Sequence, residues 1–71
     1  MKEIFIREEF IRLDSVLKFS GIIGTGGQAK MVIQDGLVTV NDEICTMRGK
    51  KLRNGDIVKF ENYQFVIKNE G

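Results

Sequence analysis

The first thirteen residues carry the apolar pattern of two short strands. Residues Lys2 to Ile6 are rich in β-branched and aromatic side chains, and Phe10 to Leu13 form a second apolar stretch after the charged residues Arg7 to Glu9. Short runs of this composition on either side of a polar break are typical of a β-hairpin. The pattern therefore predicts an N-terminal hairpin.

A first helix is predicted directly after this stretch. Leu13, Val16 and Leu17 have the i, i+3, i+4 spacing that places apolar side chains on one helical face. Asp14 stands where an N-cap carboxylate would accept backbone N–H groups. Ser20 and Gly21 mark the expected end of the helix.

A second helix is predicted from about Gly26 to Asp35. Thr25 to Gln28 has the T-x-x-Q form of a capping box, and Gly36 is a suitable C-terminal stop. The apolar positions that follow the cap share one helical face: Ala29, Val32 and Ile33.

The remaining chain has the pattern of short antiparallel strands. Residues 37–40 and 43–45 flank Asn41-Asp42, which tolerates the left-handed backbone of a tight hairpin turn. Residues 57–60 and 63–67 flank a second turn at Glu61-Asn62. The sequence thus predicts an α+β fold in which two short helices pack on a small, mostly antiparallel sheet.

Length and composition restrict the classes of protein further. A chain of 71 residues is expected to form a single domain, 1–71, with a small core. Histidine is absent and Cys45 is the one cysteine, which excludes an internal disulfide, the common zinc spacings and histidine-based catalysis. We therefore expect no enzyme activity, metal or cofactor. No apolar run is long enough for a membrane span or signal peptide, so a cytoplasmic protein is expected.

Charge is distributed unevenly along the chain. The net charge is +1, but residues 10–55 carry +3 and the two ends together carry −2. Four of the eleven cations lie between Arg48 and Arg53, with no acid between Glu43 and Asp56. Such a local excess can attract phosphates without an extreme pI, although a solvated surface loop explains the same charges.

The start of the second predicted helix is a candidate anion site. Free N–H groups and the helix dipole favour an anion there, and Gly26 and Gly27 permit close approach. Lys30 lies one turn further, off the apolar face. The alternative is a sharp turn that needs glycine for its backbone angles.

Cationic residues elsewhere in the chain are also candidates for phosphate contacts. Arg12 could either pair with Asp14 or contact a phosphate, and Lys18 alone is explained equally by solvation. Arg48, Lys50, Lys51 and Arg53 offer forked and point-charge donors for phosphates. No aromatic residue is interleaved with these four cations, which argues against a stacking platform for single strands.

Taken together, these motifs resemble the RNA-binding domain named after ribosomal protein S-four. The resemblance covers about residues 10–60 and rests on five stretches: Arg12 to Asp14, Leu17-Lys18, Thr25 to Lys30, Gly36 to Asn41 and Gly55 to Val58. The stretch Thr25 to Lys30 and the basic segment are similar to short stand-alone bacterial members of that family.

The resemblance implies an α-L motif that binds structured RNA, such as ribosomal RNA, a ribosome-assembly intermediate or transfer RNA. It also implies the ribosome or its precursors as partners, and a monomer is expected. The implied RNA-contacting residues are Arg12, Lys18, Thr25, Gly26, Gly27, Gln28, Lys30, Arg48, Lys50, Lys51 and Arg53. This chain departs from the family pattern at two places. It has Gly26-Gly27 where the family often has Ser-Arg or Ser-Lys, and its turn is Asn41-Asp42 where Asn-Gly is usual.

A β-grasp sulfur carrier is the alternative of similar length. That chemistry requires a C-terminal Gly-Gly, whereas this chain ends Asn69-Glu70-Gly71. A carrier would also leave the basic segment unexplained.

Overall fold

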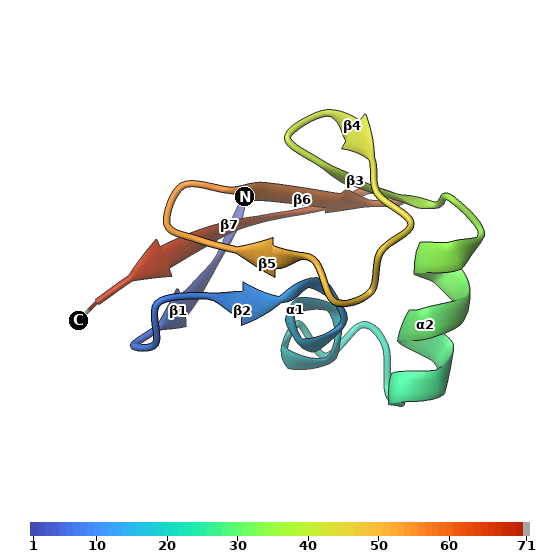
Figure 1. The fold of residues 1–71 in the computed structure, drawn as a ribbon, viewed down its shortest axis with the longest axis horizontal. Helices are drawn as coiled ribbons and strands as arrows, with labels where there is room; N and C mark the ends of the chain where they lie inside the picture. The colour runs from blue at the N-terminus through green and yellow to red at the C-terminus, as the bar shows by residue number, and fades with distance from the viewer. Residues whose placement is uncertain (71) are drawn as a thin grey trace.

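A computed structural model describes residues 1–70 and contains two helices, a main sheet and a small β-ribbon (Figure 1). The helices are α1 (Leu13–Phe19) and α2 (Gly26–Gln34). The strands, in chain order, are β1 (Lys2–Ile6), β2 (Ile11–Arg12), β3 (Val38–Val40), β4 (Glu43–Ile44), β5 (Lys51–Leu52), β6 (Ile57–Phe60) and β7 (Tyr63–Asn69). The predicted α+β class is confirmed.

The main sheet has the strand order β1-β7-β6-β3-β4, and β2 pairs separately with β5. All pairings are antiparallel except β1 with β7, which run parallel from Lys2 opposite Phe65 to Ile6 opposite Asn69. The predicted N-terminal hairpin is therefore wrong. Its two strands form, but each one pairs with a strand from the C-terminal half of the chain.

The core lies between one face of the main sheet and the helices. Alternate positions on the strands are buried, as in Val58 and Phe60 of β6 and Phe65 and Ile67 of β7. A strand directs successive side chains to opposite faces, so one face of the sheet packs inward. Figure 1 shows both helices and the β2–β5 ribbon along the same side of this sheet.

The predicted turns are present with the expected backbone. Asn41 and Asp42 have φ values of 51° and 70°, which is the left-handed geometry of a two-residue hairpin between β3 and β4. The Asn41 side chain also donates to Asp56 at 3.1 Å and accepts from the Ile57 amide at 2.9 Å, tying the turn to β6. Gly36, with φ of 76°, follows the end of α2 as predicted.

Candidate nucleic-acid interface

The basic segment Arg48 to Arg53 is fixed to the start of α1 by backbone hydrogen bonds. The amide of Leu13 donates to the Lys50 carbonyl at 2.9 Å, and the amide of Asp14 donates to the Arg48 carbonyl at 3.1 Å. The segment was expected to be a loop, yet Lys51-Leu52 is a strand that pairs with Ile11-Arg12. It is thus an anchored edge that is fixed to the start of α1 rather than a free loop.

This anchoring also corrects the prediction for Asp14. The helix begins at Leu13 with Arg12 in the N-cap position, and the Arg12 side chain makes no capping hydrogen bond. The first amides of a helix need acceptors from outside the helix, and carbonyls of the basic segment supply two of them. Asp14 is therefore a first-turn residue and not the N-cap.

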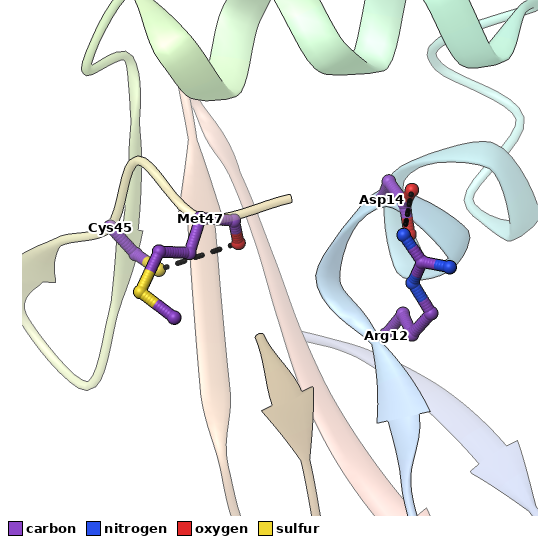
Figure 2. A network of polar contacts seen from close by, with 4 residues as sticks. All are labelled: Arg12, Asp14, Cys45 and Met47. Carbon is purple, nitrogen blue, oxygen red and sulfur yellow. Dashed lines mark hydrogen bonds and ion pairs between the residues drawn. The ribbon is translucent and has the colours of Figure 1, made fainter. Parts of the chain in front are cut away.

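Arg12 lies at the centre of this arrangement. Its guanidinium donates to an Asp14 carboxylate oxygen at 3.3 Å (Figure 2) and retains 51% side-chain exposure. A Cβ placed on Gly49 would lie 3.7 Å from Arg12 Nη2, so the guanidinium also lies beside the basic segment. Of the two roles predicted for Arg12, the pairing with Asp14 is confirmed. One carboxylate contact leaves most of the five guanidinium donors available.

The β2–β5 ribbon separates apolar from basic side chains. Ile11 and Leu52 are opposite each other and buried, whereas Arg12 and Lys51 are opposite each other and exposed. Lys51 Nζ lies 4.8 Å from the centroid of the Phe10 ring. The sequence within the basic segment contains no aromatic residue and therefore did not predict this neighbour. Phe10 comes two residues before Arg12, and extended backbone directs such a pair of side chains to the same side, which was the available clue.

Five of the predicted contact residues are exposed cations without an internal partner. Among residues 1–70, no ion pair or side-chain hydrogen bond engages the side chains of Lys18, Lys30, Arg48, Lys50 and Arg53. Three cations outside the central region do have partners: Lys2 with the Ser20 carbonyl, Arg7 with Glu70 and Lys59 with Asp42. Free positive charge is therefore concentrated in the predicted site.

The Lys59 pair also bears on the acid in the β3–β4 turn. Asp42, the second departure from the family pattern, adds a negative charge to this turn. Its carboxylate accepts from Lys59 Nζ at 2.8 Å, so its charge is locally compensated.

The start of α2 has one half of the predicted capping box, because within residues 1–70 the Gln28 side chain makes no return hydrogen bond to the Thr25 amide. Thr25 Oγ1 accepts from the Gln28 amide at 3.1 Å. A Cβ added at Gly26 or Gly27 would meet no atom within 4 Å, and neither residue has a positive φ. The backbone therefore does not require glycine at these two positions, and the alternative of a sharp turn that needs glycine loses its support. The space above the start of the helix is open.

The two halves of the predicted site are connected through α1. Within residues 1–70, no hydrogen bond or ion pair connects the segment 25–30 directly to the basic segment. Helix α1 packs against α2 and is capped by the basic segment, so it holds both parts in one framework. Lys18 is exposed in the last turn of this helix.

Other chemistry is sparse in the described part of the chain. Cys45 follows β4, is partly buried, and directs its thiol toward the Met47 carbonyl at 3.8 Å (Figure 2). Within residues 1–70, no three histidine, cysteine or acidic side chains are grouped as metal ligands. Neither helix there has the length and apolar character needed to cross a membrane.

The architecture and its anchored basic ribbon define a small α+β module of the α-L type. Residues 4–68 match the S4 domain family, and the chain belongs to that family. The match extends beyond the predicted residues 10–60 at both ends, because it includes residues 4–6 of β1 and most of β7.

Individual relatives support this assignment. The chain is 42% identical over 60 residues to the probable ribosome maturation protein RlbA of Bacillus subtilis, covering 84% of each protein. It is 46% identical over 48 residues to the small ribosomal subunit protein uS4 of a Wolbachia from Brugia malayi, covering 68% of this chain and 24% of that protein. The shared part is thus about a quarter of the ribosomal protein.

A solved structure has the same fold. The solution structure of YbcJ from E. coli, described as an α-L motif involved in RNA binding, superposes with a TM-score of 0.74. The two sequences are 26% identical, and the match covers 96% of this chain and 87% of YbcJ. The predicted α-L fold is therefore confirmed.

Proposed function

We propose that this protein is a non-catalytic, single-domain module that binds structured RNA through phosphate contacts from its basic face. The observation that carries the proposal is the anchored segment Arg48 to Arg53, whose cations are exposed and whose Lys51 lies opposite Arg12. A fixed array of cations loses less entropy on binding than a flexible loop does, and arginine and lysine both match phosphate oxygens.

The proposed contacts fall into two groups. Arg12, Lys18, Lys30 and the four cations of the basic segment contribute charge to phosphates. Thr25, Gly26, Gly27 and Gln28 form the start of α2, where free amides and the helix dipole favour an anion. Most such contacts position RNA and carry no sequence information, so selectivity comes from the shape of the folded RNA.

The relatives narrow the class of RNA. RlbA is named as a probable ribosome maturation protein, and uS4 is a ribosomal subunit protein. We infer that the ligand is ribosomal RNA, a ribosome-assembly intermediate or transfer RNA, bound by a cytoplasmic monomer. The α-L fold gives no support to the sulfur-carrier alternative.

Crosslinking in cells tests the class of RNA. We expect ultraviolet crosslinking of the tagged protein, followed by sequencing, to enrich discrete structured sites in ribosomal, precursor or transfer RNA after normalisation to RNA abundance. The same experiment with Lys50, Lys51 and Arg53 replaced by alanine should lose these sites. Reads that follow abundance alone, equally for both proteins, would overturn the proposal.

The start of α2 has its own test. Gly27→Glu should fold normally, since its side chain enters open space and a carboxylate suits a helix N-terminus. It should nevertheless weaken binding to folded RNA by about tenfold or more, because it places a negative charge where a phosphate is proposed to lie.

Gly27→Ala is the matched control, since it adds a Cβ without charge and should bind within about threefold of the parent. Binding by Gly27→Glu equal to that of Gly27→Ala, measured by fluorescence anisotropy, would assign Gly27 no part in the interface.

A further inference from the structure

A hollow beside the basic ribbon is lined by three phenylalanines that the predicted site did not include. Phe5 comes from β1, Phe10 precedes β2, and Phe19 is the last residue of α1. The hollow has a volume of about 430 Å³. This volume is in the range of roughly 300–1,000 Å³ that small-molecule pockets occupy.

Two of these rings are exposed without contributing to the core. Phe5 is 56% and Phe19 is 69% exposed. Phe5 points to the face of β1 opposite to the buried side chains of Ile4 and Ile6. Large apolar side chains that gather at one exposed place mark an interaction site more often than single ones do.

The surroundings of the hollow favour a nucleotide. Arg7 and Arg12 line it together with one acid, Glu8, and each arginine makes a single ion pair elsewhere, with Glu70 and Asp14 respectively, that leaves donors free. Lys51 lies over the Phe10 ring. Aromatic faces next to cations are the combination that binds unpaired nucleotides, since the rings stack on bases and the cations contact the adjoining phosphates. A stable protein interface would instead need about 1,200 Å² of total buried area, with few charges at its centre.

We propose that this hollow receives an unpaired base of the same RNA whose phosphates contact the basic segment. The inference rests on the proposed function and adds a structural requirement to the ligand, namely a bulged or looped-out nucleotide next to a helical stem. Arg12 connects the two regions, because its side chain lines the hollow and also lies beside Gly49 of the basic segment. Lys51 connects them in the same way through its contact with Phe10.

The probe is a pair of RNA hairpins with the same stem, one fully paired and one with a single bulged adenosine. We expect the parent protein to bind the bulged hairpin about tenfold more tightly, the effect of one base stacked on an aromatic ring. The double variant that carries Phe5→Leu and Phe19→Leu should lose this preference and keep the parent's affinity for the paired hairpin. Phe5→Tyr with Phe19→Tyr should retain it, because the aromatic faces remain.

A matched control uses an exposed aromatic residue outside the hollow. Tyr63 is 46% exposed and does not line the hollow, so Tyr63→Leu should keep the full preference. Salt provides a second control, because stacking releases no counterions. The leucine variants should therefore show the same salt dependence as the parent on the paired hairpin, with only the preference for the bulge lost.

Each result separates this inference from the proposed function. A parent that binds both hairpins equally, or leucine variants that keep the preference, would overturn the inference while the phosphate-binding proposal stands. If the parent protein bound neither of the two hairpins, both the inference and the proposed function would be overturned. Self-association that the leucine variants abolish, with the preference for the bulge unchanged, would assign the hollow to a second copy of the chain and overturn the inference.

Discussion

Replacing Lys50, Lys51 and Arg53 by alanine is expected to lower the affinity for folded RNA about 100-fold or more. All three side chains are exposed on the anchored segment, and each lost phosphate contact removes a charge-assisted hydrogen bond worth about tenfold at low salt. Fluorescence anisotropy with a labelled ribosomal RNA fragment measures the loss. The melting temperature should change by only a few degrees, because exposed substitutions usually alter stability by about 0.5 kcal/mol or less each.

A charge-matched variant provides the control. Replacing Lys2, Lys59 and Lys68 by alanine removes an equal number of positive charges, one each from strands β1, β6 and β7. This control should keep most of the affinity, because those lysines lie outside the proposed face. An equal loss of binding in both triple variants would show that total charge matters and that the basic segment does not.

The largest expected effect on stability comes from Leu52→Ala. Leu52 is the fully buried residue of the basic segment and lies opposite Ile11. Removing a buried leucine side chain costs about 2–5 kcal/mol, a large part of the stability of a domain this small. We expect the melting temperature, followed by circular dichroism, to fall by at least about 10 °C.

The same substitution should weaken RNA binding below the melting transition, because Leu52 holds the cations in place. Leu52→Met is the conservative comparison, since it nearly preserves volume and should cost less than about 1.5 kcal/mol. If Leu52→Ala melted within a few degrees of the parent, the anchoring role assigned to this residue would be wrong.

The locally encoded parts of the fold were predictable from the sequence. Thr25 and Gly36 delimit α2 through cap and stop chemistry that acts within a few residues. Asn41-Asp42 specifies its hairpin in the same local way. These elements were predicted with nearly correct bounds for that reason.

The pairings between distant segments were not predictable in this way. The β-branched and aromatic composition shows that Lys2 to Ile6 can form a strand, but it does not show which strand lies beside it. The partner of β1 is β7, more than fifty residues further along the chain, and β2 pairs with β5. The nearest candidate in sequence was therefore chosen wrongly.

For the candidate site, the sequence identified the cations but not their arrangement. Lys51 and Arg12 were both proposed, yet their pairing across a ribbon depends on the β2–β5 contact. The capping of α1 by carbonyls of the basic segment depends on the same contact, and it displaced Asp14 from its predicted role. The phenylalanine hollow was missed because its rings come from three separate segments: β1, the residue before β2 and the end of α1.

Measuring RNA affinity as a function of salt tests the central claim most directly. The logarithm of the association constant for a folded ribosomal RNA fragment should fall linearly with the logarithm of salt concentration, with a slope of about −3 to −6. The variant lacking Lys50, Lys51 and Arg53 should have a slope smaller in magnitude by about 2 to 3, roughly one for each lost phosphate contact. Parallel lines for parent and variant, or a parent slope near zero, would contradict phosphate binding by the basic segment.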